Sequence, residues 1–331
     1  MAQLVEHILG KDEVTSSNLV ISSSAPAIAG AFSFYIHNLF AGIAHHFIFG
    51  GLHMNISINP PHFKKAAVWE TERTLTEAID LVYDAGFRHF DLEAETLEDA
   101  ETIAAHIKDK NVRIIQSHMP FNRYKRIPTE IFRKNLMDCA TYAKMIGAEI
   151  LVVHGDEFDY LNQIYTAKGA LEYNHRFFYD LVAYAEKNGM RVAFENTFQE
   201  STKLNRPHYC AFVEDLCALV DSYGTKNVGI CWDSGHAKVQ YYERDIDALR
   251  LAGSRVICTH IHDNYFSQDM HAFPFLGEIH WKDFMQTLKD IGYAGDLSLE
   301  FVYDRLPKAL APDYLKLLYR TGEYLANEVT K

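Results

Sequence analysis

Residues Val228–His236 read VGICWDSGH, and this stretch decides the fold. It begins as a short apolar run and then delivers a carboxylate, a chain breaker and an imidazole. Short apolar runs of this kind are typical of strands buried on both faces, as in a parallel sheet covered by helices. We therefore expect Asp233 at the end of a strand and His236 one turn beyond it. In α/β barrels this carboxyl edge is where reactive groups collect.

The same strand pattern recurs along the chain from Met54 onward. Together with the central stretch it predicts strands at Met54–Ile58, His89–Glu93, Val112–His118, Ile150–His154, Arg191–Glu195, Val228–Asp233, Val256–His262 and Asp296–Phe301. Helical patterns lie between these runs. Two apolar sets have the i, i+3, i+4, i+7 spacing of an amphipathic helix. They are Leu75, Ala78, Ile79 and Val82, and Phe178, Leu181, Val182 and Ala185.

Glycines mark the expected ends of four helices. A glycine just past the last helical residue is a common stop signal, and the candidates are Gly86, Gly147, Gly189 and Gly292. Eight strands alternating with eight helices predict an α/β fold of the (β/α)8 TIM-barrel type. An open doubly wound sheet is the alternative. No GxGxxG motif follows the first strand, however, so nothing supports a dinucleotide site.

Residues 1–53 differ from the rest and are predicted to lie outside the barrel, which we place at residues 54–331. Val14–Ala25 is rich in serine, and Pro26–Gly51 is largely apolar. The stretch lacks the early basic residues of a signal peptide, and histidines interrupt it as a membrane span. The opening residues resemble spurious reading frames that start upstream of a gene, which would make Met54 the native start. A poorly ordered extension and a membrane anchor are the alternatives.

Charge and cysteine content restrict the partners and the location. The net charge is −12 and no run of Lys and Arg forms a basic stripe, so nucleic acid and membrane surfaces are not expected as partners. The five cysteines are odd in number and include no CxxC pair. Reduced, buried thiols in a cytoplasmic protein fit this pattern better than a disulfide framework or a thiolate metal site.

Six consecutive predicted strands end in histidine or a carboxylate. These residues are His118, His154, Glu195, Asp233, His260 with His262, and Glu300. The loop after the seventh strand adds Asp269 and His271. Taken singly, each would more often be a hydrogen-bonded rim residue than a metal ligand. Carboxylates gathered in one barrel mouth repel one another unless a cation or a proton intervenes, so the set favours a divalent metal. Mixed carboxylate and imidazole ligands suit manganese, cobalt, zinc or iron and fit calcium poorly.

These residues lie in motifs that resemble the xylose-isomerase-like TIM-barrel superfamily, which includes sugar phosphate isomerases and epimerases and the AP endonuclease family 2. The motifs are EN at Glu195, WDSGH at Trp232–His236, HIHDN at His260–Asn264, Asp269-x-His271 running into LGEIHW, and LE at Glu300. The resemblance extends from Met54 to about Val329. It implies a divalent metal (manganese, cobalt, magnesium or zinc) held by Glu195, Asp233, His260 and Glu300. His260 is preferred to His262 because the family's ligand stands three residues before an acidic residue, here Asp263.

The resemblance also implies a reaction. In the family's ketose 3-epimerases two glutamates remove and return a proton next to a carbonyl, and Glu195 and Glu300 match those catalytic positions. Two departures leave hexulose specificity open, because Tyr265-Phe266 replaces a family arginine and Ser201 replaces a family glutamate. Isomerisation, epimerisation or dehydration of a sugar, a sugar phosphate or a related polyhydroxy carbonyl compound is therefore expected.

Endonuclease IV, which cleaves abasic DNA with three metals, is the alternative. All nine of its ligand types have counterparts here, which adds His118, His154, His236, Asp269 and His271 as further metal or substrate ligands and raises the expected number of metals from one to as many as three. The acidic charge opposes DNA, and the basic residues of one loop, Arg123, Lys125 and Arg126, are few. A catalytically inactive binding module is a third reading.

A carbohydrate small molecule is thus the expected partner. Its binding is assigned to His236, His262, Trp232 and Phe266, since aromatic rings can stack on the apolar face of a sugar. Relatives in the superfamily commonly form dimers or tetramers, so a homo-oligomer is expected as well.

Overall fold

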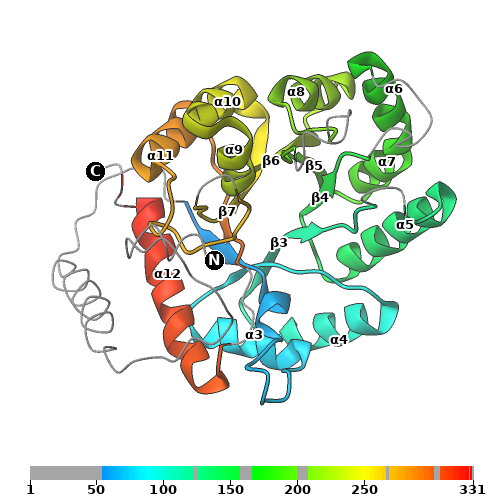
Figure 1. Ribbon diagram of the computed structural model, residues 1–331. Helices are drawn as coiled ribbons and strands as arrows, with labels where there is room; N and C mark the ends of the chain where they lie inside the picture. Colours follow the sequence, from blue (N-terminus) through cyan, green and yellow to red (C-terminus); the bar gives the residue numbers. More distant parts are fainter. Residues whose placement is uncertain are drawn as a thin grey trace, which may run out of the picture. The chain divides into compact units, whose positions relative to one another are not determined.

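The computed structural model describes residues 54–122, 126–156, 166–199, 208–265, 268–301, 306–327 and 329. Its strands form a closed barrel in the order β1 to β8 (Figure 1). Every neighbouring pair is parallel, and β8 returns to pair with β1 through Ile56 and Leu297. The predicted (β/α)8 barrel is confirmed. The prediction for residues 1–53 lies outside the described part of the chain.

The eight predicted strands are all present, and their ends differ from the prediction by two residues or fewer. The strands are β1 Ile56–Ile58, β2 His89–Asp91, β3 Arg113–His118, β4 Ile150–His154, β5 Arg191–Glu195, β6 Val228–Asp233, β7 Val256–Ile261 and β8 Leu297–Leu299. The central stretch VGICWD is buried along its whole length, as its apolar composition predicts.

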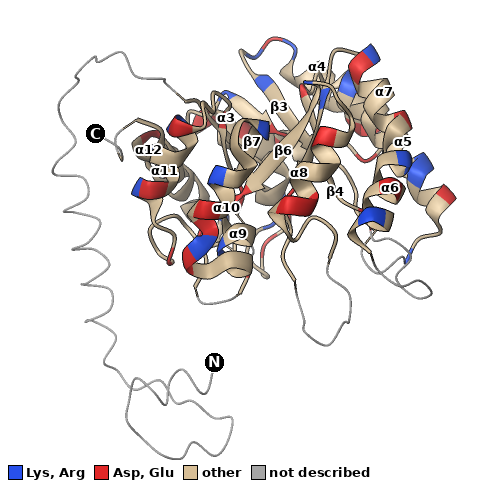
Figure 2. Cartoon of the chain, turned by 90° about the horizontal axis from the view of Figure 1, so that it is seen from above, with Lys and Arg blue, Asp and Glu red and all other residues tan. Residues whose placement is uncertain are grey.

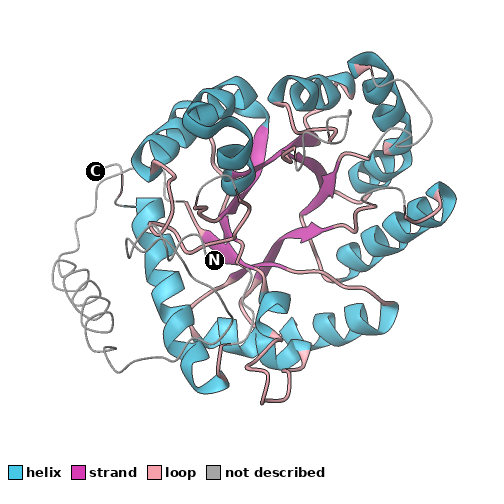
Figure 3. Ribbon diagram, viewed as in Figure 1, coloured by secondary structure: helices cyan, strands magenta, loops and turns pink. Residues whose placement is uncertain are grey.

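Helices surround the strands as an outer ring (Figure 3). The α-helices of the described residues are α3 Leu75–Asp84, α4 Leu97–Ile107, α5 Thr129–Met145, α6 Ala167–Phe177, α7 Tyr179–Lys187, α8 Val213–Ser222, α9 Ser234–Tyr241, α10 Asp245–Ala252, α11 Trp281–Asp290 and α12 Ala311–Asn327. Short 3-10 helices occur at η1 Pro60–Phe63, η3 Tyr242–Arg244, η4 Gly253–Arg255 and η5 Lys308–Leu310.

The expectation of one helix per crossover is wrong at two places. Two helices, α6 and α7, connect β4 to β5, and two others, α9 and α10, connect β6 to β7. Between α9 and α10 the backbone of Tyr242 has a φ of 54°, a conformation that ends a right-handed helix. The four predicted helix-ending glycines are confirmed, since Gly86, Gly147, Gly189 and Gly292 all have positive φ directly after helix caps.

The barrel interior aims the predicted ligands at the mouth. It is filled by Ile150, Val152, Ala193, Cys231 and Cys258. Because alternate side chains of a strand share a face, the next inward-pointing residue of each strand lies at its carboxyl end. These residues are His154, Glu195, Asp233 and His260. A larger apolar cluster packs between the strands and the helices.

Charged residues lie mainly on the outer helices, with both signs interspersed (Figure 2). Several form ion pairs, such as Arg113 with Glu149 and Arg255 with Asp221, each with a shortest distance of 2.7 Å. Among the described helices, none combines the length and the apolar character that crossing a membrane requires.

Candidate metal centre in the barrel mouth

The carboxyl ends of the strands line a cavity of about 860 Å³. Seven of the residues predicted from the sequence contribute to its wall, namely His118, His154, Glu195, His236, Asp269, His271 and Glu300. Asp233 and His260 lie beneath them and are 0% and 1% exposed. The structure therefore brings all nine predicted ligand types together at one end of the barrel.

Glu195, at the end of β5, is the centre of this group. Its Oε2 lies 3.1 Å from His118 Nε2 and 3.2 Å from His154 Nε2, and its Oε1 lies 3.2 Å from His236 Nδ1. Burial alone would raise the pKa of Glu195, but nearby imidazoles, with His260 first among them, hold this pKa well below its ordinary value. Glu195 is therefore a buried carboxylate that can bridge neighbouring sites.

The four residues that the resemblance assigns to a metal form a compact central group. Ligand atoms of Glu195, Asp233, His260 and Glu300 all lie within 4.8 Å of one another. The Nδ1 atom of His260 is 2.9 Å from Glu300 Oε2 and 3.4 Å from Glu195 Oε2. This arrangement matches the mixed carboxylate and imidazole set that suits divalent transition metals.

A buried pair that the sequence reasoning missed, Asp91 with Gln116, lies behind His260. Asp91, at the end of β2, places its Oδ2 3.5 Å from His260 Nε2 and accepts a 2.7 Å hydrogen bond from Gln116. A carboxylate behind an imidazole fixes the ring and leaves its other nitrogen for a metal. Asp91 ends β2 in the structure, but the strand predicted from the sequence continues to Glu93, so the strand-end criterion that selected Asp233 would have pointed to Glu93 instead.

Two further groups flank the central one. His118 and His154 share Glu195 with it, and ligand atoms of these three residues again lie within 4.8 Å of one another. On the other side, Asp269 Oδ2 lies 3.5 Å from His236 Nε2 and 3.4 Å from His271 Nε2. His262 completes this second group.

Unsatisfied polar atoms test whether an ion fits here. His260 Nδ1, Asp269 Oδ1, His271 Nδ1 and Glu300 Oε2 are buried and make no hydrogen bond of favourable geometry among the described residues, although His260 Nδ1 and Glu300 Oε2 lie 2.9 Å apart. A buried polar atom without a partner costs about 1–3 kcal/mol. Divalent cations would satisfy several of these atoms at once and neutralise the clustered carboxylates, so the donor set fits metal binding.

Cys231 is a further potential ligand. Its Sγ lies within 4.8 Å of ligand atoms of Glu195 and His260. Burial, followed by the neighbouring Cys258, raises the pKa of the Cys231 thiol well above its ordinary value. Without metal the thiol is therefore protonated at neutral pH, and it would have to lose this proton to bind a metal.

The predicted substrate contacts are placed unevenly. His236 lines the cavity, but Trp232 and His262 do not. Trp232 is 1% exposed and packs in the apolar layer outside the barrel, because it precedes Asp233 and alternation turns it to the opposite face. The assignment of these two residues to substrate binding is therefore corrected: Trp232 is a packing residue, and His262 supports the metal centre. Phe266 lies outside the described residues.

His262 is held beneath the centre instead. It is 0% exposed, its Nε2 lies 3.0 Å from Asp233 Oδ2, and its ring stacks on His271 with centroids 4.0 Å apart. The absence of a side chain at Gly235 makes room for it, since a Cβ there would lie 1.9 Å from the His262 ring.

We expect Gly235→Ala to lower the midpoint of thermal unfolding. The added methyl group must displace the His262 ring and break its contact with Asp233. Overpacking and a lost buried hydrogen bond together cost about 2–4 kcal/mol, or roughly 5–10 °C for a domain of this size. The control is Gly189→Ala, whose methyl group meets nothing within 4 Å and adds only backbone strain. A Gly235→Ala variant as stable as this control would refute the close packing.

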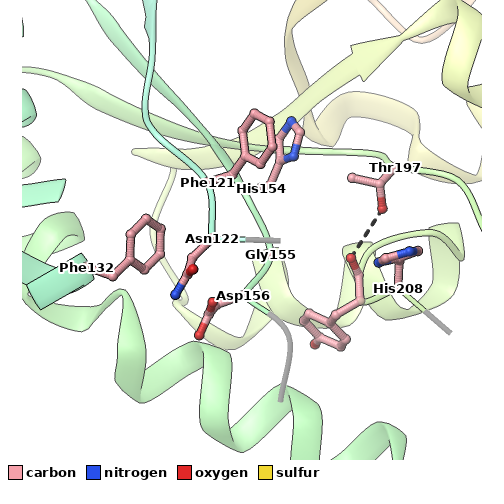
Figure 4. Close-up of a pocket in the computed structure, with 9 residues that line it drawn as sticks. Phe121, Asn122, Phe132, His154, Gly155, Asp156, Thr197 and His208 are labelled. Atoms are coloured by element: carbon pink, nitrogen blue, oxygen red, sulfur yellow. Dashed lines mark hydrogen bonds between the residues drawn. The ribbon is translucent and has the colours of Figure 1, made fainter. Parts of the chain in front are cut away.

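Phe121 lies against His154 at the edge of the centre (Figure 4). Its ring stacks on His154 with centroids 4.7 Å apart and an interplanar angle of 14°. Behind these rings is a small cavity of about 30 Å³, bordered by Asn122, Asp156 and His208. Such a volume holds about two water molecules, so the larger cavity is the one that can admit a substrate.

Metal binding is expected to release protons. Burial lowers the pKa of His118, but Glu195 raises it to about 9, and Asp269 likewise overcomes burial to raise the pKa of His271 to about 9. Both imidazoles carry a proton at neutral pH without metal and must lose it to bind one. Below about pH 9, affinity should therefore rise with pH, by about tenfold per unit for each proton released. Zinc calorimetry in two buffers of different ionisation enthalpy measures this release, and equal heats would contradict it.

Comparisons with known proteins identify the family and the fold. Residues 77–321 match the family described as the xylose isomerase-like TIM barrel. An uncharacterised protein, y4fM of Sinorhizobium fredii, is 24% identical over 284 residues, which cover 76% of this chain and 88% of that protein.

Two solved structures have a similar fold. A D-tagatose 3-epimerase-like protein aligns with a TM-score of 0.64 and 20% identity, over 83% of this chain and 99% of that chain. An IolI protein crystallised with a zinc atom aligns with a TM-score of 0.60 and 16% identity, over 84% of this chain and 98% of that chain. At these identities the likeness establishes a common fold.

Proposed function

The chain belongs to the xylose isomerase-like TIM barrel family, and from that premise we propose that it is a divalent-metal-dependent isomerase or epimerase of a sugar, a sugar phosphate or a related polyhydroxy carbonyl compound. Membership confirms the resemblance seen in the motifs. The observation that carries the proposal is the convergence of Glu195 and Glu300 on the Nδ1 atom of His260 at the floor of the cavity. The similar structure described as a D-tagatose 3-epimerase-like protein supports the reaction class.

We assign the central metal to four residues, Glu195, Asp233, His260 and Glu300. Manganese, cobalt, magnesium and zinc all accept such oxygen and nitrogen ligands, and the similar IolI protein was crystallised with zinc. When bound, the ion would polarise the substrate carbonyl and favour the negative charge that develops on its oxygen.

Proton transfer is assigned to the two glutamates. The side chain of Glu300 is 19% exposed and its Oε2 contacts His260 Nδ1 at 2.9 Å, whereas the side chain of Glu195 is only 2% exposed. In this proposal one carboxylate removes a proton from the carbon next to the carbonyl, and the other returns a proton. The result is an inverted stereocentre or a carbonyl group moved along the carbon chain. His236 lines the same cavity and would hold a substrate oxygen.

Solvent hydrogen exchange tests the proposal directly. The protein loaded with manganese is incubated in heavy water with a panel of ketoses and ketose phosphates, and the products are examined by NMR. A new epimer or isomer that carries deuterium next to the carbonyl is the expected result, because a carboxylate equilibrates its proton with solvent. Absence of exchange with every compound, at full metal loading, would reject the proposal.

A multi-metal phosphodiesterase is the second candidate. The two histidine-rich groups that flank the central one favour it, since together with the central group they contain all nine ligand types of the endonuclease IV site. Against DNA stand the net charge of −12 and the described cavity wall, which contains no Lys or Arg. Incubation with an abasic oligonucleotide and with bis-p-nitrophenyl phosphate separates the candidates, because only this second function would cleave them.

We further propose that residues 54–331 form the catalytic domain, that the partner is a carbohydrate small molecule rather than nucleic acid or a membrane, and that the protein is a cytoplasmic homo-oligomer. Size-exclusion chromatography with light scattering measures the oligomeric state. A monomer at micromolar concentration would contradict it.

A further inference from the structure

A second polar group faces the cavity from the ends of β1 and β2, which lie between β8 and β3 in the barrel. Its members are Asn59, which follows β1, His62 in η1, and Glu93, which follows β2. Asn59 Nδ2 donates a hydrogen bond of 3.3 Å to Glu93 Oε1. Ser57 and Asp91 face the barrel interior and are 0% and 2% exposed. Strand alternation thus aims Asn59 and Glu93, two positions further on, into the mouth.

This group, which we call the Asn59 group, is incomplete without a ligand. Asn59 is 4% exposed, and its Oδ1 has no hydrogen-bond partner within the described residues. The Nδ1 atom of His62 lacks one as well. Buried polar atoms in folded proteins are nearly always paired. An acceptor and an imidazole nitrogen left open beside a cavity therefore match the hydroxyl groups of a bound molecule, which both donate and accept.

The charge of the cavity wall restricts which chemical groups the bound molecule can carry. Seven carboxylate residues line the described part of the cavity, namely Asp91, Glu93, Glu95, Asp138, Glu195, Asp269 and Glu300, and no Lys or Arg does so. Glu93 and Glu95 stand on the same side as Asn59. A phosphate group placed beside Asn59 would meet Glu93 and Glu95 with no Lys or Arg of the described wall to compensate them, and this repulsion disfavours binding.

We propose that Asn59, His62 and Glu93 form a hydroxyl-binding subsite for the end of an unphosphorylated polyhydroxy substrate that points away from the carboxylate and histidine centre. The inference rests on the proposed function and narrows it, because it excludes a phosphate at that end. Asn59 Oδ1 accepts a hydrogen bond from one hydroxyl group and Glu93 pairs with a neighbouring one, while His62 Nδ1 pairs with a further oxygen. These residues position the substrate and take no proton from carbon.

Paired substrates and one substitution test the subsite. The full-length, manganese-loaded protein is assayed with each ketose and with its terminal phosphate ester, for example D-tagatose and D-tagatose 6-phosphate. We expect kcat/KM to be at least about tenfold higher for the free sugar. Asn59→Ala should raise KM by about tenfold and change kcat by less than about threefold, since uniform binding is lost and the reacting atoms are untouched. A preference for the phosphate ester, or an unchanged KM, would overturn the inference.

Controls separate a local effect from misfolding. Asn111→Ala removes an exposed asparagine before β3, at the other end of the barrel, and should behave as wild type. His62→Ala serves if Asn59→Ala does not fold, with the same expected rise in KM. Metal content must equal that of wild type in every variant.

Calorimetry distinguishes failure of the subsite from failure of the proposed function. If no ketose is turned over, the proposed reaction fails, and D-tagatose binding to the wild type and Asn59→Ala proteins is compared instead. Binding that weakens about tenfold in the variant supports the subsite without the reaction. Equal binding, or none to either protein, overturns it.

Discussion

Glu300→Gln is expected to lower kcat by roughly 10²–10⁴-fold. The carboxylate Oε2 of Glu300 lies 2.9 Å from His260 Nδ1 and faces the cavity, where it can reach a proton next to a substrate carbonyl. Glutamine keeps the shape of the side chain and an oxygen that can contact an ion, but it accepts no proton from carbon. The measurement is kcat under saturating manganese, with the metal content of the variant determined on the same sample.

Glu95→Gln is the matched control for this change. Glu95 lines the same cavity and is exposed, and it belongs to none of the ligand groups of the described residues. Its removal should change kcat by less than about threefold, because surface charges contribute little to a reacting centre at a distance. If Glu300→Gln retained wild-type kcat at full metal loading, Glu300 would not be a proton-transferring residue.

His118→Ala is expected to lower the metal content by about one equivalent per chain. The wild-type protein, purified without added metal, should contain more than one equivalent, because three groups of ligand atoms meet around Glu195 and Asp269. His118 Nε2 lies 3.1 Å from Glu195 Oε2 and contributes only to the group with His154. Removing one of three ligands weakens that ion and leaves the four residues of the central group in place. Elemental analysis by mass spectrometry measures the change.

The control for metal content is His280→Ala, which removes an exposed histidine, with a side chain 63% exposed, outside the ligand groups. One equivalent in wild type that is unchanged in His118→Ala would contradict the expectation and identify a single-ion isomerase. Two or three equivalents that fall in His118→Ala would show that the flanking groups bind metal. Abasic DNA and phosphate esters would then be tested before any sugar.

Sequence reasoning was accurate for the strands and for the chemical types at their ends. A buried parallel strand must be apolar along its length, and this local requirement located β6 and its seven counterparts. The ligands could be named for the same reason, since an apolar run that ends in His or a carboxylate is visible in one dimension. His118, His154 and Glu195 were found in this way, and each lines the cavity.

Neighbouring residues were harder to assign. Trp232 stands beside Asp233 in the sequence, yet alternation turns its ring into the apolar layer between strands and helices. His262 shares the direction of His260 but is buried against Asp233 and His271. The order of residues is the same whichever face a side chain takes, so the motif could not separate packing residues from residues of the cavity wall.

The sequence by itself determined the strand pattern, the barrel class and the set of ligand types, because these depend on local periodicity and composition. Only the tertiary structure decided which of these residues meet. Closure of the barrel pairs β8 with β1, joins His89 to Asp296 across 207 residues, and brings Glu300 to His260 and Asn59 to Glu93. Such contacts depend on how strands curve and close in space, and no local pattern records the distance between two strand ends.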